Sequence, residues 1–436
     1  MLNQRPHVVI IGAGFGGLAA AKALKKAPVR ITLIDRSNHH LFQPLLYQVA
    51  TSVLTPGHIA SPIRELLRRQ KNVTVVMREV TRIDKDQRCV YATNPDGDTC
   101  AIEYDYLILA TGARHSYFGH DKFERHAPGL KTLADAVSIR NKILSAFELA
   151  ETEPDPSQHK DLLTFVLVGA GPTGVEVAGA IATLVRYTMR SEFRRIDPRW
   201  TRIILIHEGK RILPTFADNL STAAHRRLTD LGVEVRLGER VEQVDERGVV
   251  LRGGERIRSR VVVWTAGVTP SPAGKWIGAN LDRAGRIQVQ NDLSVPGNPE
   301  IFAIGDLASF EQDGRVLPGV AQVAIQGGRY VGTAIKSRLT GYPRPVPFRY
   351  RDKGSLAIVG PNFGLLQRGN LHLSGMVACL VWVWVHIQFL VQASLQLTVF
   401  FQWMWTYFTG QRGSRLIVNH QGPEPVPAPL RESVSL

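Results

Sequence analysis

Residues 7–35 read HVVIIGAGFGGLAAAKALKKAPVRITLID, and this stretch decides the fold. A short β-branched run leads into Gly12, an Ala/Leu-rich helical segment follows Gly17, and a second apolar run ends at Asp35. This order predicts the opening unit of a dinucleotide-binding domain, which consists of a strand, a G-x-G-x-x-G turn, a helix, a second strand and an acidic residue. Gly12 would make the tight turn, Gly14 would let the backbone approach a pyrophosphate, and Gly17 would let helix and strand pack closely. Asp35 would accept a hydrogen bond from a ribose hydroxyl.

The same device recurs later in the chain. Residues 163–168 (LTFVLV) lead into the glycine turn GAGPTG at 169–174, and after a helical segment the strand RIILIHE ends at Glu208. Glu208 lies further along the chain from its glycine turn than Asp35 does, because a basic and aromatic insertion, residues 186–200, lengthens the connection. A carboxylate at this position accepts from a ribose 2′-hydroxyl and repels a 2′-phosphate, which favours NADH over NADPH. Two copies of one architecture predict an α/β fold with two Rossmann-like domains.

Three further turns follow strands that read as buried. Ala110-Thr111-Gly112 follows YDYLIL, and Thr265-Ala266-Gly267 follows RVVVW. Small residues in such turns let the chain pass close to a bound nucleotide. The strand IFAI leads into Gly305-Asp306, a turn that beside a flavin would aim a carboxylate at ribitol hydroxyls. Taken alone, this last turn also fits an ordinary aspartate turn.

Composition narrows the class of protein. The 436 residues suggest two or three domains, and the net charge of +15 implies an anionic partner. No Lys/Arg run or RNA-type motif supports nucleic acid, so an acidic membrane surface is the better candidate. The three cysteines, Cys89, Cys100 and Cys379, form no C-x-x-C pair, which excludes a dithiol redox centre. We expect no metal site and, because no signal peptide precedes the first motif, a reducing compartment.

The segment 369–411 contains no Asp, Glu, Lys or Arg, although it holds four of the seven tryptophans. Gln388, Gln392 and Gln396 recur every four residues and predict a polar stripe on one helix. Tryptophan prefers the membrane interface. Three interpretations compete: a transmembrane helix, for which residues 376–400 are long enough, a buried helix pair, and an amphipathic helix lying in one leaflet. The last fits the aromatic and glutamine content best.

The motifs together resemble the two-dinucleotide-binding-domain flavoproteins, and within them the type II NADH:quinone oxidoreductases, which are single-subunit and do not pump protons. The resemblance rests on GAGFGG, HHLFQPLLYQVAT, VGAGPTGVEVAGA, AIGD, AQVAIQ and the aromatic C-terminal segment. Disulfide reductases of this group need a cysteine pair near the first helix, and this chain has none there. The resemblance implies FAD on the first glycine turn, NADH on the second, and electron transfer to a membrane quinone.

The resemblance also implies domain limits and site residues. It places a discontinuous FAD domain at 1–114 and 297–345, an NADH domain at 115–296, a membrane-associating region at 346–415 and a tail at 416–436. Glu176 would position nicotinamide or take part in quinone reduction, and Lys353 resembles a family lysine near flavin and quinone. Gln322 and Gln326 share a helical face and match the family's quinone motif, although two solvent-facing glutamines are the alternative. The expected cofactor-binding residues are Gly12, Gly14, Phe15, Gly16, Gly17, Asp35, Arg36, Val80, Thr111, Gly112, Asp306, Ala321 and Gln322 for FAD, and Gly169, Gly171, Thr173, Gly174, Glu208, Ala266 and Gly267 for NADH.

Two other functions stay open at this point. One is an NADH-dependent reductase of a soluble iron–sulfur carrier, which the aromatic C-terminal segment disfavours. The other is a membrane-tethered NADH-binding sensor, which a complete second nucleotide site beside a flavin disfavours. For the favoured function we expect ubiquinone or menaquinone as acceptor, a membrane lipid surface and a possible homodimer as partners, and no nucleic acid. We expect a peripheral protein on the cytoplasmic face of the cell inner membrane.

Overall fold

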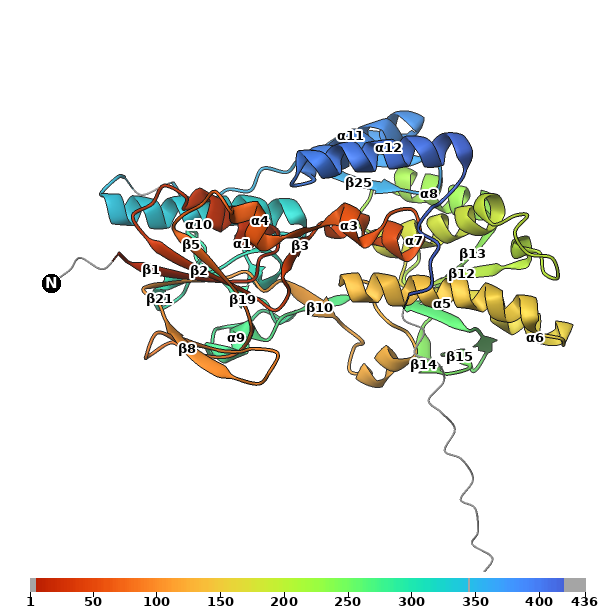
Figure 1. The fold of residues 1–436 in the computed structure, drawn as a ribbon, viewed down its shortest axis with the longest axis horizontal. Helices are drawn as coiled ribbons and strands as arrows, with labels where there is room; N and C mark the ends of the chain where they lie inside the picture. The colour runs from red at the N-terminus through yellow and green to blue at the C-terminus, as the bar shows by residue number, and fades with distance from the viewer. Residues whose placement is uncertain (1–4, 344–345, 419–436) are drawn as a thin grey trace, which may run out of the picture.

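Two mainly parallel sheets, one in each half of the molecule, organise the chain (Figure 1). The computed structural model describes residues 5–343 and 346–418. The first sheet lies in the half that contains the N-terminal strand, and the second lies in the half that contains the long helix α5 (Leu133–Thr152). A pair of C-terminal helices, drawn in blue, lies at the top of this view above the middle of the molecule and its right-hand half.

The first sheet carries the first glycine turn. Its central strand β1 (His7–Ile11) pairs in parallel with β2 (Arg30–Asp35) and β9 (Tyr106–Leu109), and all five of its residues are buried. Burial on both faces explains why this strand is apolar without alternation. Helices α1 (Phe15–Ala23) and α10 (Ala321–Thr340) cover one face. The sheet continues with β5 (Val73–Met77), β21 (Asn298–Ala303) and β20 (Ser294–Val295), and its other face packs on the small sheet β6 (Glu79–Asp84), β7 (Cys89–Thr93) and β8 (Thr99–Glu103).

The second sheet repeats this layering, which confirms the α/β class with two Rossmann-like units. Its central strands β11 (Thr164–Val168) and β12 (Arg202–His207) run parallel, and all of β11 is buried. The flanking strands are β13 (Val233–Leu237) and β17 (Val261–Trp264). One face packs on α2 (Leu46–Ala50), α5 (Leu133–Thr152), α7 (Pro172–Thr183) and α8 (Asp218–Asp230), and the other on β14 (Val241–Asp245), β15 (Gly248–Leu251) and β16 (Arg256–Arg258).

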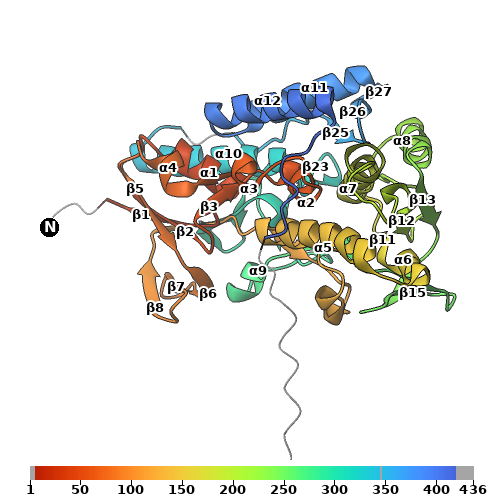
Figure 2. The same cartoon turned by 45° about the vertical axis from the view of Figure 1, so that its right-hand side comes forward.

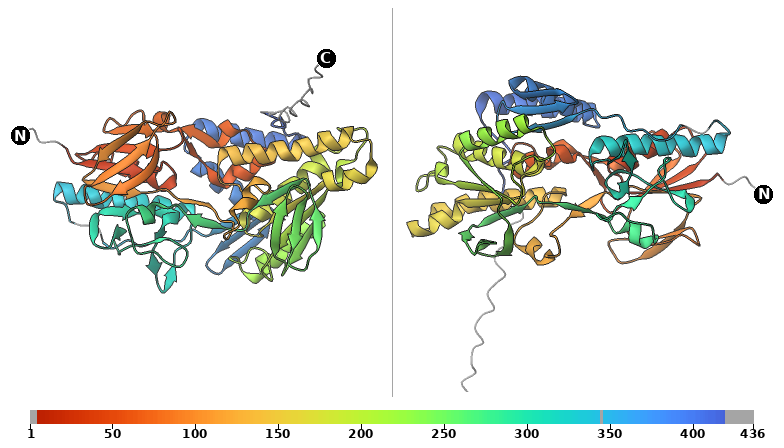
Figure 3. Two further views of the ribbon diagram at one scale, coloured as in Figure 1. Left: turned by 90° about the horizontal axis from the view of Figure 1, so that it is seen from below. Right: turned by 180° about the vertical axis from the view of Figure 1, so that it is seen from behind.

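Two of the segments that connect the units, one outgoing and one returning, pair with each other. Strand β10 (Ala113–His115) leads out of the first unit and pairs antiparallel with β18 (Val268–Pro270), which leads back (Figure 3). Helix α9 (Ala273–Trp276) and strand β19 (Ile287–Gln288) then pack into the core of the first unit. Residues of α9 and β19 therefore share a core with the first sheet, while the expected limits of the NADH domain, 115–296, stay a prediction.

The C-terminal region begins with a three-stranded antiparallel sheet that the sequence analysis did not foresee: β25 (Ser355–Ile358), β26 (Gly364–Arg368) and β27 (Leu371–Gly375). Two helices follow, α11 (Met376–Phe389) and α12 (Ala393–Thr409), and they lie side by side over the rest of the molecule (Figure 2). Among the residues described, no helix combines the length and apolar character needed to cross a bilayer. The short remaining elements are β3 (His39–Leu41), α3 (Pro56–Ile59), β4 (Ala60–Pro62), α4 (Ile63–Leu67), α6 (Pro156–Leu162), β22 (Ala308–Ser309), β23 (Glu311–Gln312) and β24 (Arg315–Val316).

The predicted glutamine stripe on a single helix is wrong. The helix ends at Phe389 because Leu390 adopts an extended backbone, and a new helix starts after Gln392. The side chain of Gln392 accepts a hydrogen bond from Ser61 at 3.2 Å, and that of Gln396 donates to the Leu390 carbonyl at 3.0 Å. The amides of Gln392 and Gln396 therefore make hydrogen bonds around the break between α11 and α12, and they do not form a stripe along one helix. Of the expected tail, residues 419–436 lie outside the described residues.

Candidate functional site

The first glycine turn is built by close backbone contacts. Gly12 has a left-handed backbone (φ +100°), and its N–H donates to the Ile34 carbonyl at 2.8 Å. A Cβ at Gly12 would collide with the Ala110 carbonyl, and one at Gly17 would collide with the Gly12 carbonyl. A Cβ at Gly14 would meet nothing within 4 Å. The first and last glycines therefore pack protein against protein, and Gly14 leaves space open for a ligand.

A cleft of about 890 Å³ opens at this turn. Most of the expected FAD residues line it, together with Thr173 at the start of α7, so that the N-terminal ends of both glycine-turn helices reach one cleft. Gly17 lies inside the packing, and Val80 is buried in the core beneath the sheet. The expected residues in the lining are Gly12, Gly14, Phe15, Gly16, Asp35, Arg36, Thr111, Gly112, Asp306 and Ala321.

Two of the carboxylates in the lining of this cleft, Asp35 and Asp306, were expected to bind the cofactor. Asp35 accepts hydrogen bonds from the backbone N–H groups of Ala13 and Ser37, both at 2.7 Å, which hold its carboxylate in place. Asp306 lies 3.7 Å from the Lys131 ammonium, a partner that the sequence analysis missed because the two residues are remote in the chain. A glycine cradle at a helix N-terminus with carboxylates beside it suits a dinucleotide with pyrophosphate, ribose and ribitol. The lining therefore fits FAD.

The second glycine turn reproduces the first. Gly169 has φ +104°, its N–H donates to the Ile206 carbonyl at 2.8 Å, and a Cβ there would collide with Ala266. A Cβ at Gly174 would collide with the Gly169 carbonyl, whereas one at Gly171 would again meet nothing within 4 Å. The second turn therefore offers the same ligand space as the first.

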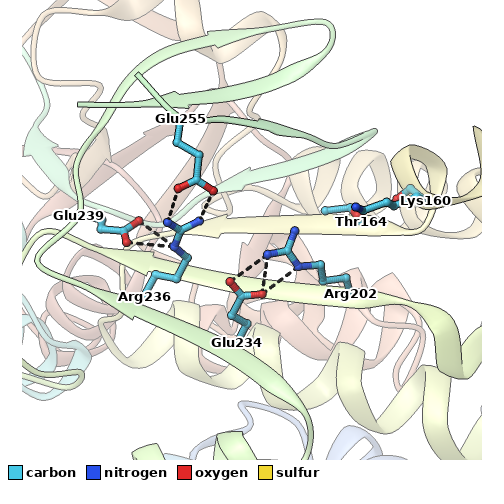
Figure 4. A network of polar contacts seen from close by, with 7 residues as sticks. All are labelled: Lys160, Thr164, Arg202, Glu234, Arg236, Glu239 and Glu255. Carbon is cyan, nitrogen blue, oxygen red and sulfur yellow. Dashed lines mark hydrogen bonds and ion pairs between the residues drawn. The ribbon is translucent and has the colours of Figure 1, made fainter. Parts of the chain in front are cut away.

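Glu208 follows β12 and is exposed, with its carboxylate 3.8 Å from the Arg240 guanidinium. The turn that carries Arg240 is tied to the chain around Glu208, because Gly238 N–H donates to the Gly209 carbonyl at 3.1 Å and Glu239 N–H to the His207 carbonyl at 3.2 Å. Ion pairs of Arg236 with Glu239 and Glu255, and of Arg202 with Glu234, brace this edge of the second sheet (Figure 4).

Glu176 lies one turn into α7. Its Oε1 accepts a long hydrogen bond, 3.4 Å, from the Ile358 N–H on β25. Burial raises the pKa of Glu176 to about 8, so the carboxyl is neutral at pH 7. Tyr47 is buried in the same region, and burial, with the Glu176 charge as a second cause, raises the pKa of its hydroxyl well above the ordinary value. The arrangement can hold a proton on Glu176, one helical turn after Thr173, which lines the cleft.

Gln326 is not free to face a ligand in this structure. Its amide donates to the Arg351 carbonyl and accepts from the Arg351 N–H, both at 3.0 Å. Gln312 holds the neighbouring Tyr350 in the same way, at 3.2 and 2.8 Å. The two glutamines thus clamp the segment that leads into Lys353, whose ammonium lies 5.6 Å from the centre of the Phe389 ring on α11. Gln322 is half-buried on α10 and carries no such clamp.

A series of rings connects the first glycine turn with the C-terminal helices. Phe15 meets Phe42 at 5.8 Å between ring centres, Phe42 meets His386 at 6.2 Å, and His386 stacks on Trp382 at 4.0 Å. Trp382 in turn lies 5.3 Å from Trp403 of α12. Burial lowers the pKa of His386 to about 4, so the imidazole is neutral. The inner side of α11 and α12 is therefore packed against the back of the cleft.

Other residues near the cleft were not anticipated. Gln48 accepts a hydrogen bond from the Trp403 indole at 2.7 Å, and the buried Arg412 donates to the carbonyls of Thr51 and Ala180 at 2.8 and 3.2 Å. Phe118 lines the cleft with an exposed ring. The YQVAT motif was a signal for Gln48, but no local pattern pointed to Arg412 or Phe118, because their contacts come from distant parts of the chain.

Comparison with known proteins adds the following. Residues 6–328 match the model of the pyridine nucleotide-disulphide oxidoreductase family. The type II NADH:quinone oxidoreductase Ndh of Mycobacterium tuberculosis is 46% identical over 429 residues, 96% of this chain and 91% of the relative. NdhA of the same organism is 45% identical over 430 residues, 96% of this chain and 90% of the relative. The structure of NDH2 from Plasmodium falciparum in complex with NADH matches with a TM-score of 0.86 at 20% identity, over 95% of this chain and 100% of that chain, and supports the fold.

Proposed function

We propose the function of this chain from one premise, which is that it belongs to the pyridine nucleotide-disulphide oxidoreductase family and, within it, to the type II NADH:quinone oxidoreductases. As a member of that group it is a flavoprotein that transfers electrons from NADH through FAD to a quinone. Bound FAD would supply the redox chemistry, which is the acceptance of hydride from NADH and the release of electrons to a quinone. The chain itself supplies binding, orientation and control of protons.

One observation carries the assignment of roles to residues. The N-terminal ends of α1 and α7 reach the same cleft, where Gly14 and Phe15 line it from the first helix and Thr173 from the second. Each helix begins behind a glycine turn whose middle glycine leaves open space. We therefore assign FAD to the first turn and NADH to the second, with the reactive rings meeting between the two helix ends.

The quinone side of the site is assigned to the residues between this cleft and the C-terminal helices. Glu176 holds a proton at neutral pH close to the cleft, and a neutral carboxyl donates where a carboxylate cannot. Gln322 lies on α10, and Gln326 fixes the segment that presents Lys353. These four residues surround the path by which a quinone from the α11 side would approach the flavin.

The test measures steady-state NADH oxidation with a short-chain quinone, with a soluble iron–sulfur carrier, and with no acceptor. Fast turnover with the quinone alone supports the assignment. Preference for the iron–sulfur carrier would make the chain a carrier reductase. NADH binding without turnover on any acceptor would make it a sensor. Ubiquinone and menaquinone analogues, compared at equal concentration, identify the quinone class.

We also propose that α11 and α12 bind a membrane surface without crossing it. Their outward side chains are large and apolar: Trp384 is 66% exposed, Phe401 65% and Phe408 74%. Monomeric soluble proteins rarely leave such a contiguous apolar face uncovered. The net charge of +15 favours anionic head groups, and NADH and the free thiols of the described chain suit the cytoplasmic face of the inner membrane.

Replacement of these three residues by serine should release the protein from anionic lipid vesicles and leave turnover with a soluble quinone unchanged. Trp200, 63% exposed and outside this face, supplies the matched serine control. The groove of α12 lined by Phe401, Trp405 and Phe408 also suits a second copy of the chain, so molecular mass in detergent is measured in parallel. Dimers without vesicle binding would assign this face to a homodimer.

A further inference from the structure

Phe118 combines two features that a merely structural residue does not need. Its side chain is 60% exposed, and it belongs to none of the four hydrophobic clusters formed by the described residues. Its backbone has φ +52°, a left-handed conformation that is unfavourable for an aromatic residue. Such strain persists where the surrounding structure imposes it, often at ligand sites.

The contacts of neighbouring residues impose the left-handed backbone of Phe118. Ser116 N–H donates to the Gly267 carbonyl at 3.1 Å, and the Trp264 indole donates to the Ser116 carbonyl at 2.8 Å. Tyr117 is buried against Trp264, with ring centres 5.3 Å apart. These contacts clamp the segment to the end of β17 in the second unit, and the backbone then turns the Phe118 ring outward.

The ring lines the cleft that opens at the first glycine turn, and it also lies against Gly267 of the second unit. A Cβ built on Gly267 would lie 2.7 Å from Cζ of Phe118, so the ring occupies the space that a side chain at 267 would need. Gly267 follows Ala266, which contacts the turn at Gly169. Phe118 also lines the cleft that Thr173 enters from α7. The ring therefore lies at the junction of the two nucleotide sites.

We propose that Phe118 is a positioning residue for the nicotinamide dinucleotide, with its ring forming a wall of the NADH site and Gly267 kept free of a side chain to seat that ring. An exposed aromatic face suits a ligand that carries flat heteroaromatic rings. The proposal rests on the assignment of NADH to the second glycine turn. It adds a side chain from the crossing segment between the units to a site otherwise built from the second unit.

The experiment measures NAD⁺ binding to the FAD-loaded enzyme by calorimetry, together with FAD content and Tm. Phe118→Ala is expected to weaken NAD⁺ about tenfold, to raise KM for NADH with little change in kcat, and to retain FAD. Gly267→Ala should weaken NAD⁺ similarly because the new methyl displaces the ring. The double variant should be no weaker than either single variant, since both act on the same ring.

Phe118→Gly separates ligand positioning from a structural role. It should weaken NAD⁺ and at the same time raise Tm, because glycine adopts positive φ without strain. Tyr187→Ala, which removes a ring of 61% exposure outside the cleft, should change neither. Unchanged NAD⁺ affinity with a lower Tm in Phe118→Ala would overturn the proposal, and so would loss of FAD with NAD⁺ affinity retained. Gly171→Val is measured alongside: if it keeps full NAD⁺ affinity, the assignment of the second turn has failed, independently of Phe118.

Discussion

The two glycine turns share one backbone design but differ in how their acids are held. Asp35 accepts two hydrogen bonds from backbone N–H groups, both at 2.7 Å. Glu208 is 72% exposed, and its carboxylate lies 3.8 Å from the Arg240 guanidinium. A carboxylate fixed by backbone donors is preorganised for its ligand, whereas a solvated side chain has to order when a ligand binds.

The helices that follow the two turns also differ in how tightly they are packed. Helix α1 packs so closely on α10 that a Cβ at Gly328 would collide with the Gly16 carbonyl. At the start of α7, Pro172 and Thr173 are exposed. A similar sequence motif therefore serves two purposes. The tightly packed first turn suits a resident cofactor, and the more exposed second turn suits a substrate that must leave after each turnover.

The largest effect is expected from Gly14→Val. The backbone at Gly14 is extended and a Cβ meets no protein atom, so the variant should fold. Its side chain would fill the space where the backbone approaches a pyrophosphate. We expect a colourless protein with wild-type circular dichroism and no activity. If the purified variant stays yellow with stoichiometric FAD, the first turn does not hold the cofactor.

Gln326→Ala should act on the quinone half-reaction. Loss of the clamp on Arg351 loosens the segment that leads to Lys353. We expect flavin reoxidation by quinone to slow roughly tenfold, about 1.4 kcal/mol, and bleaching by NADH to stay within a small factor of wild type in stopped flow. Gln312→Ala, which removes the matching clamp on Tyr350, should slow reoxidation in the same direction. Equal slowing of bleaching would place these glutamines at the flavin.

Glu208→Gln should relax the choice of donor. Removal of the carboxylate ends its repulsion of the 2′-phosphate of NADPH, while Arg240 stays in place beside residue 208. We expect the NADPH-to-NADH ratio of kcat/KM to rise about fivefold, the scale of one exposed charge contact. Arg252→Ala, from the comparable exposed pair Arg252–Glu242, is the control. A ratio that does not move would show that Glu208 lies away from the ribose.

The smallest effect concerns pH. Burial raises the pKa of Glu176 to about 8 from the ordinary glutamate value of 4.5. The stability that the protonated form contributes is therefore complete below pH 4.5 and lost as pH rises through 8. Turnover with a soluble quinone should fall about twofold at pH 8, where half of the carboxyl is ionised. In Glu176→Gln, turnover should no longer fall between neutral pH and pH 8. A fall that persists in the variant must come from the titration of another group.

The contrast between the units also shows what sequence reasoning reaches. Both glycine turns were predictable because each is local, a strand, a turn and a helix within about thirty residues. The environments of Asp35 and Glu208, the clamp of Gln326 on Arg351, and the left-handed Phe118 were not, because each depends on contacts between distant segments. The glutamine repeat failed for a related reason: Leu390 breaks the helix where α11 must fold back into α12, and the sequence period carries no sign of that reversal.

The most direct test of the account is stopped-flow reduction and reoxidation of Gly171→Val, the counterpart of Gly14→Val in the second unit. A Cβ at Gly171 meets no protein atom, so only the ligand's space is filled. We predict a yellow enzyme with full FAD that dithionite bleaches and quinone reoxidises at the wild-type rate, while bleaching by NADH slows at least about a hundredfold. Bleaching by NADH at the wild-type rate would contradict the division of labour between the two turns.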